Sequence, residues 1–132
     1  MTRFESESVV LNTPCEEVFS FLSDFRKIKQ VMPEQIINWK AEEDSCSFTI
    51  QGVADLSMRL ASMSHCRNIH IVSEGNNPIE YSMDYFFIKK GDSQCEVTVL
   101  LDAELNALLK MMASRPLQNL VDMIAGKLKE MY

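Results

Sequence analysis

Two histidines and two tyrosines are the side chains of this chain best suited to moving protons. His65 and His70 could act as acids or bases near neutral pH, because an unperturbed imidazole titrates in that range. His70 alternates with Ile69 and Ile71 in a strand-like pattern and should face away from them. His65 is out of phase with the inward apolar positions that precede it. We therefore expect both to be ordinary strand histidines that face away from the core.

Tyr81 and Tyr85 fall on the more apolar face of a strand predicted over 79–88, so their rings should point inward. A buried phenol hydroxyl needs a hydrogen-bond partner, which can be a ligand or can be backbone and water. Trp39 is in the same way either a pocket wall or a filler of the core. These three residues are the candidates for orienting a bound molecule.

No motif for nucleophilic, metal or nucleotide chemistry accompanies these residues. The sequence contains no Ser-His-Asp signature, no His-Glu-x-x-His motif, no phosphate-binding loop and no dinucleotide fingerprint. Cys15, Cys46, Cys66 and Cys95 are widely spaced and form no Cys-x-x-Cys pair. We expect four reduced thiols that serve as small apolar side chains, with no metal site, no cofactor and no catalytic residue.

Composition and charge are those of an ordinary globular chain. With 132 residues, of which 46% are hydrophobic and 24% charged, we expect one core and a single domain over 1–132. A net charge of −6 would repel a phosphate backbone, so nucleic acid is not an expected partner. The first residues lack the apolar segment of a signal peptide, and no segment approaches the ~20 apolar residues that span a bilayer. The sequence therefore predicts a cytoplasmic protein without integral membrane association.

The first quarter of the chain predicts one strand and two short helices. Phe4–Leu11 has the pattern of a strand, and the Thr-Pro-Cys-Glu segment at 13–16 combines an N-cap hydroxyl, an early proline and a glutamate at N3. Apolar residues at helical spacing then continue to about Phe25. A second short turn is predicted over Arg26–Val31, and Pro33 ends it.

The period of the apolar residues changes from 3.6 to 2 after Gln35, which indicates antiparallel hairpin strands. Clusters of glycine, proline, asparagine and charged residues separate these strands. The segment Cys95–Leu105 alternates most regularly, which is typical of a strand with one face on the core and one in water. Only Leu100 interrupts its polar series.

A long helix closes the chain. Asn106 is a good N-cap, and an apolar stripe runs from Leu109 to Met131. Pro116 removes one helical hydrogen bond, which predicts a kink or break near Ser114. Strands followed by one long covering helix predict an α+β layer arrangement, with a curved sheet around the helix.

The predicted order of elements resembles the helix-grip fold of the Bet v 1-like, START-related superfamily, also called SRPBCC proteins. The resemblance covers nearly the whole chain and is most specific at two segments. The first is 4–25, which contains Thr-Pro-Cys-Glu-Glu-Val-Phe-Ser-Phe-Leu-Ser-Asp at 13–24; the second is 105–117, which begins Leu-Asn-Ala-Leu-Leu-Lys-Met-Met and ends Pro-Leu. Small bacterial members are very similar at both. The resemblance implies an antiparallel sheet of about seven strands wrapped around the C-terminal helix, with two short helices after the first strand.

Membership of this superfamily would imply a cavity between the long helix and the concave sheet. Many members bind lipids, quinones, polyketides or other hydrophobic molecules there, and some are cyclases or dehydratases. This chain lacks the glycine-rich loop of the plant members and is shorter than the START lipid-transfer domains. We therefore expect a small or partly filled pocket.

The predicted pocket combines the inward strand residues with the apolar stripe of the helix. Nine methionines supply either an adaptable lining or a core that tolerates irregular packing. The pocket residues predicted are Trp39, Phe48, Met58, Tyr81, Met83, Tyr85, Val97, Val99, Met112, Leu120 and Ile124.

Three functions are consistent with the sequence. The first is a carrier or sensor that binds a small hydrophobic molecule, such as a lipid, quinone or polyketide, without catalysis. The second is a cyclase or dehydratase with Tyr85 or His70 as the proton donor. The third is a protein-interaction module or homodimer with a filled interior, for which exposed apolar side chains at Phe86, Ile88 and Leu100 would be the sign.

Overall fold

The computed structural model describes residues 1–75 and 77–132, and its strands form one antiparallel sheet. The sheet has eight strands in the order β1-β8-β7-β6-β5-β4-β3, with β2 also paired to β8. The elements are β1 (Thr2–Glu5), β2 (Val9–Leu11), α1 (Cys15–Leu22), the 3₁₀ helix η1 (Ile28–Val31), β3 (Ile36–Ala41), β4 (Ser45–Ile50), β5 (Ala54–Ser64), β6 (Asn68–Ser73), β7 (Glu80–Gly91), β8 (Gln94–Glu104) and α2 (Ala107–Met131).

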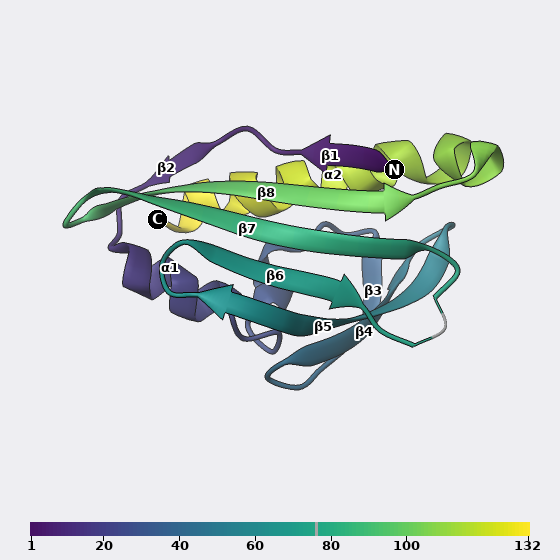
Figure 1. Ribbon diagram of the computed structural model, residues 1–132, viewed down its shortest axis with the longest axis horizontal. Coiled ribbons are helices and arrows are strands. Elements are labelled where there is room, and N and C mark those ends of the chain that lie inside the picture. Colours follow the sequence, from purple (N-terminus) through teal and green to yellow (C-terminus); the bar gives the residue numbers. More distant parts are fainter. Residues whose placement is uncertain (76) are drawn as a thin grey trace.

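The sheet curves around α2, which runs along its concave face (Figure 1). Alternation in β7 sets that face: Tyr81, Met83 and Tyr85 are buried, whereas Phe86 and Ile88 are exposed. Because β8 pairs with β7 along nearly its whole length, its alternating buried residues from Cys95 to Ala103 fall on the same side, and only Leu100 is buried on the other. The predicted α+β architecture, with one sheet and a long C-terminal helix, is confirmed.

The predicted first strand is divided into β1 and β2. The hydroxyl of Ser6 accepts a hydrogen bond from the amide of Val99 at 2.9 Å, and the Ser6 amide donates to the Val99 carbonyl at 2.9 Å. A buried serine side chain therefore occupies the place of a regular ladder bond, and β1 and β2 pair with separate stretches of β8.

The start of α1 differs from the predicted capping box. The helix begins at Cys15, and the hydroxyl of Thr13 donates to Oε2 of Glu17 at 2.7 Å instead of accepting from the helix. The Pro14 carbonyl accepts from the Glu17 amide at 3.1 Å. The helix ends at Leu22, earlier than the predicted end near Phe25.

The last helix is longer and more regular than the proline suggested. The side chain of Asn106 accepts from the amide of Leu109 at 2.9 Å, so the predicted N-cap is confirmed. The helix continues through Pro116 without a break, and the predicted break near Ser114 is wrong. Pro116 is partly exposed, and Met112, whose carbonyl loses its helical donor, is 46% exposed.

Cys15 and Cys95 form a disulfide, with Cα atoms 5.0 Å apart. The expectation of four reduced thiols is therefore wrong for this pair; Cys46 and Cys66 are free thiols. The bond joins the first residue of α1 to the beginning of β8, across a sequence separation of 80 residues. Spacing alone could not indicate this pairing. Among the described residues, no helix is long and apolar enough to cross a membrane.

Candidate functional site

An apolar cavity lies between α2 and the concave face of the sheet. Its walls come from β4, β5, β7, β8 and α2 and from the segments next to η1 and β7. The lining residues are Met32, Phe48, Ile50, Leu56, Met58, Ile79, Tyr81, Met83, Leu101, Leu117 and Leu120. The lining surface is entirely apolar, so the cavity is suited to a hydrophobic occupant.

The cavity is very small as it stands. Its volume for the centre of a water-sized sphere is about 10 Å³. One water molecule needs roughly 10–15 Å³ on this measure, and pockets for small ligands usually have volumes of about 300–1,000 Å³. The interior is therefore almost filled by side chains, as the comparative shortness of the chain predicted.

Part of the predicted pocket lines this cavity. The residues that were predicted and are found in the lining are Phe48, Met58, Tyr81, Met83 and Leu120. The prediction missed Leu101, Leu117 and Met32, among others. Leu101 is in phase with the inward residues of β8, and Leu117 lies on the apolar stripe of α2, so both could have been found. Met32 follows η1 in irregular chain, where no period applies.

The other predicted pocket residues lie elsewhere. Tyr85, Val97, Val99 and Ile124 are fully buried in the core but are not part of the cavity lining. Met112 is 46% exposed and is not part of the lining of this cavity. It precedes Leu117, where α2 begins to contribute to the cavity; on its own turn Met111 is also exposed, whereas Ala113 is buried.

Trp39 lies behind the cavity wall. Its indole nitrogen donates to the carbonyl of Phe25 at 3.2 Å, and its ring stacks on Phe48 with centroids 5.5 Å apart. Phe48 itself lines the cavity. Trp39 therefore supports a wall residue and is not part of the cavity lining.

The two interior tyrosines differ in how their hydroxyls are satisfied. The hydroxyl of Tyr81 donates to the carbonyl of Ser57 at 3.1 Å. The hydroxyl of Tyr85 is buried and has no hydrogen-bond partner among the described residues. Burial raises the pKa of both phenols, and it raises the pKa of the buried Cys46 thiol to about 12. All three groups therefore keep their protons at neutral pH and can act as donors.

His70 cannot serve the cavity from its position. It lies in β6 opposite Asp84 of β7, on the face of the sheet away from α2. Its Nδ1 is 2.8 Å from Oδ1 of Asp84, and Asn68 donates to the same oxygen at 3.1 Å. His65 is exposed as expected, but it belongs to the turn between β5 and β6 and not to a strand.

Comparison with known proteins identifies the fold. No family model and no curated protein matches the chain. Among solved structures, a START superfamily protein from Mycobacterium smegmatis superposes with a TM-score of 0.70 at 14% identity, over 98% of this chain and 99% of that one. A conserved protein from Geobacillus kaustophilus gives 0.74 at 16% identity, over 98% and 94%. Norcoclaurine synthase from Thalictrum flavum gives 0.69 at 7% identity, over 98% and 85%.

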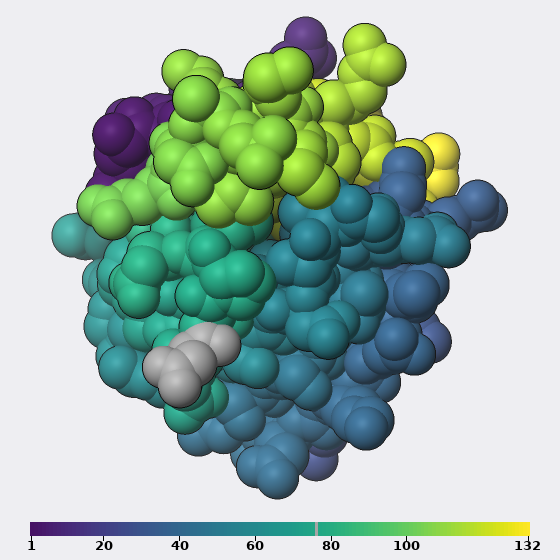
Figure 2. All heavy atoms as spheres, turned by 90° about the vertical axis from the view of Figure 1, so that its right-hand side faces the viewer, coloured from purple at the N-terminus to yellow at the C-terminus, as the bar shows by residue number. Residues whose placement is uncertain are grey.

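The chain has the START-related, Bet v 1-like helix-grip fold. At one end of the sheet, Glu80 at the start of β7 pairs with Glu104 at the end of β8, just before α2 begins. Figure 2 shows that end of the molecule, with the first turns of α2 in light green above the teal and blue strands and connections. Leu108, Met111 and Met112 are exposed on these turns. The end of the molecule near the cavity thus carries an exposed apolar rim.

The two ends of α2 are held differently. Near its C-terminus, Lys127 donates to the carbonyl of Met32 at 2.9 Å and Lys129 to that of Val10 at 2.6 Å. The carbonyl of Tyr132 also accepts from the amide of Asn12 at 3.2 Å. Among the described residues, the hydrogen bonds found for the turns before Pro116 join residues of the helix to one another or to its cap, Asn106. The start of the helix is therefore the end that can move at least cost.

Proposed function

We propose that this protein binds a small hydrophobic molecule in the helix-grip interior, as a carrier or sensor without catalysis. The observation that carries the proposal is the buried Tyr85 hydroxyl, which has no partner among the described residues. Tyr85 follows Tyr81 and Met83 on the inward face of β7. An unsatisfied buried hydroxyl costs about 1–3 kcal/mol, and a ligand acceptor would remove that cost. Lipids, quinones and polyketides all carry such an acceptor on an apolar body.

The interior can widen because methionines close it. Met32, Met58 and Met83 contribute to the cavity wall from three separate segments. Methionine is unbranched and has three rotatable bonds, so it can change rotamer with little loss of packing. Rotation of Met83, two residues before Tyr85, would extend the cavity toward the free hydroxyl. The molecule would enter beside the first turns of α2.

Affinity would come mainly from apolar burial. Each Å² of apolar surface removed from water contributes roughly 25 cal/mol before the costs of ordering are subtracted. A single hydrogen bond from Tyr85 would fix orientation and add about 1 kcal/mol.

The methionines also provide the test. With carbon-13 in the methionine methyl groups, NMR can follow the buried Met32, Met58 and Met83 separately from the exposed Met63 and Met131. The ligands to titrate are a medium-chain fatty acid, a short-tail quinone and an aromatic polyketide. We expect one of them to shift the three interior signals at stoichiometric ratio while the two exposed signals stay in place.

Two results would contradict the proposal. If no ligand of the panel moves the interior signals, and protein from its native source carries no extractable hydrophobic molecule by native mass spectrometry, the interior is a solid core. If only signals from Met111 and Met112 move, the probes associate with the exposed rim. The matched variant Tyr85→Phe should weaken binding, and Tyr81→Phe, whose hydroxyl is already satisfied, should have the smaller effect.

A second candidate function, a homodimer, has its own observation. Phe86 and Ile88 are 43% and 55% exposed on the convex face of β7, whereas Leu100 is buried there. Light scattering over a concentration series would detect a dimer, and the double variant Phe86→Ser/Ile88→Thr should abolish it. A monomer at all concentrations would exclude this candidate.

The cyclase or dehydratase alternative receives less support. Of its two proton donors, His70 faces away from the interior, and burial raises the pKa of Tyr85. A phenol with a raised pKa stays protonated and can still donate a hydrogen bond, but it is a poorer general acid. As for location, the Cys15–Cys95 disulfide argues for an oxidising compartment, against the predicted cytoplasm.

A further inference from the structure

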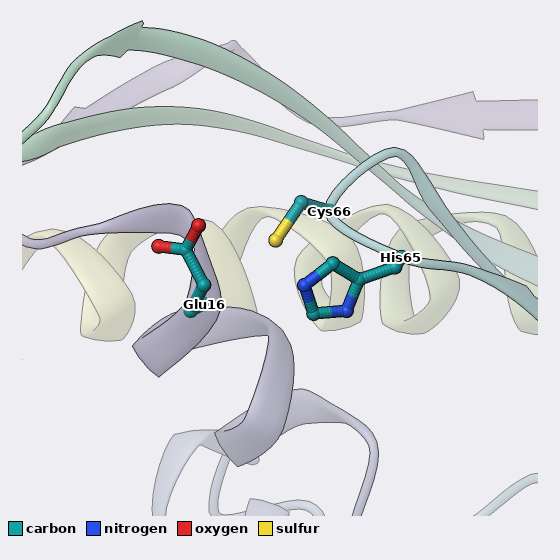
Figure 3. A group of neighbouring side chains, drawn as sticks. All are labelled: Glu16, His65 and Cys66. Carbon is teal, nitrogen blue, oxygen red and sulfur yellow. The ribbon is translucent and has the colours of Figure 1, made fainter.

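The turn between β5 and β6 brings together three side chains of a kind that bind metal ions. His65 and Cys66 belong to this turn, and Glu16 lies in the first turn of α1. One ligand atom from each lies within 4.8 Å of the other two. Figure 3 shows the Cys66 sulfur between the Glu16 carboxylate and the His65 ring.

We propose that Glu16, His65 and Cys66 form a binding site for a divalent transition-metal ion such as Zn²⁺. Thiolate and imidazole ligands favour zinc-like ions over magnesium or calcium, which prefer oxygen. Three protein ligands leave a fourth tetrahedral position for water or an added ligand. The site is separate from the proposed hydrophobic pocket and does not depend on it.

The backbone explains how two adjacent residues can share one ion. Side chains of neighbouring residues in a strand point to opposite faces. Cys66 has a φ of 55°, in the left-handed region that cysteine adopts rarely, and this redirects its side chain relative to that of His65. Strained positions of this kind cost of order 1 kcal/mol or more and occur preferentially at functional sites.

The movement needed to bind an ion is small. Zinc bonds of about 2.3 Å to sulfur and 2.0–2.2 Å to nitrogen or oxygen place tetrahedral ligand atoms about 3.3–3.6 Å apart. The present atoms lie within 4.8 Å, so closing the site requires shifts of roughly 1 Å. Glu16 and His65 are exposed and can make these shifts. The ring of Phe19 packs edge-on to His65 with centroids 5.2 Å apart.

The covalent structure also fixes the site. Cys15, which precedes Glu16, is tied to Cys95 of β8 by the disulfide. The β5–β6 turn is fixed by a hydrogen bond from the Phe87 amide to the Arg67 carbonyl at 2.9 Å. Both parts of the site are thus anchored to the β7–β8 pair, so binding orders few groups.

Cobalt is the sharpest probe, because Co²⁺ replaces Zn²⁺ and reports its ligands by absorption. The intact, disulfide-bonded protein is titrated with Co²⁺ under nitrogen, and Zn²⁺ affinity is measured by competition with a chromophoric chelator. We expect one equivalent of Co²⁺ to give a thiolate-to-cobalt charge-transfer band. Cys66→Ser should abolish the band. Each of Cys66→Ser, His65→Asn and Glu16→Gln should weaken Zn²⁺ binding by more than about 100-fold, the upper end for changes in outer-shell groups.

The matched controls are Cys46→Ala, His70→Asn and Glu7→Gln, which remove the same groups elsewhere and should leave the band and the affinity unchanged. A second readout does not depend on variants: Zn²⁺ should slow alkylation of Cys66 in the wild-type protein. The proposal is overturned if the charge-transfer band is missing, if it survives in Cys66→Ser, or if Zn²⁺ leaves the alkylation rate unchanged. Circular dichroism confirms that each variant is folded.

Discussion

Replacing Tyr85 with phenylalanine should make the ligand-free protein more stable. The substitution removes one buried hydroxyl that has no partner among the described residues and leaves the ring in place. Most substitutions of fully buried residues are destabilising, so an increase in stability is an informative result.

The size of the effect follows from the cost of burying an unpaired hydroxyl. That cost is about 1–3 kcal/mol, so the free energy of unfolding should rise by about that amount. For a chain of this length the gain corresponds to an increase in Tm of roughly 3–10 °C. Tyr81→Phe is the matched comparison, because it removes a hydroxyl that donates to Ser57 at 3.1 Å. Its expected effect has the opposite sign, a loss of about 1 kcal/mol.

Urea denaturation of the three proteins, followed by tryptophan fluorescence and far-ultraviolet circular dichroism, measures both changes. The protein must first be stripped of bound hydrophobic molecules by partial unfolding and gel filtration. The reasoning is refuted if Tyr85→Phe is less stable than the wild type in the stripped state, because the hydroxyl would then have a partner. In the presence of a ligand that uses the hydroxyl, the advantage of the phenylalanine variant should shrink or reverse.

Three further predictions concern the stability of the fold. Cys95→Ala opens the disulfide across 80 residues and should lower the free energy of unfolding by at most about 4–5 kcal/mol; peptide mapping without reductant checks the pairing. The hydrogen bonds from Arg26 lower the pKa of Asp24 from 3.8 to about 2, so this pair stabilises the folded state above about pH 4, and the contribution is lost as the pH falls toward 2. When the stability of Asp24→Asn is measured as the pH is lowered, the variant should therefore lack the loss of stability that protonation of this carboxyl causes in that range. Asn106→Ala should lower the free energy of unfolding, measured by urea denaturation, by about 1 kcal/mol, because it removes the acceptor for the Leu109 amide.

The sequence predicted the parts of the fold that depend only on residues close together along the chain. The alternation in 95–105 and 79–88 established which residues of β7 and β8 face α2, because side chains in a strand repeat with period two. Asn106 was recognisable as a cap by its residue type. The division of the first strand was not, because it depends on a hydrogen bond between Ser6 and Val99 that joins distant parts of the chain.

The same limit explains why the predicted pocket residues match the cavity lining only in part. Met112 fits the apolar stripe of α2, yet it is 46% exposed while the adjacent Ala113 is buried, and a helical period carries no information about what covers each residue. The missing partner of Tyr85 is a property of everything packed around it. His65 is exposed as predicted, but it lies in the β5–β6 turn and not in a strand; Cys66 in that turn has a φ of 55°, and neither glycine nor asparagine occurs at 65–67 to mark the turn.

The disulfide and the proposed metal site are coupled through Glu16. Reducing the Cys15–Cys95 bond frees the first turn of α1 from β8, while His65 and Cys66 remain attached to the β5–β6 hairpin. The carboxylate would then have to be ordered at the moment of binding, so the reduced protein should hold the ion less tightly. Linkage requires the reverse effect to be equal: a bound ion should make the disulfide harder to reduce by the same factor. If the cluster does not bind the ion, added Zn²⁺ will not make the disulfide harder to reduce, and Zn²⁺ binding by the released thiols would make its reduction easier.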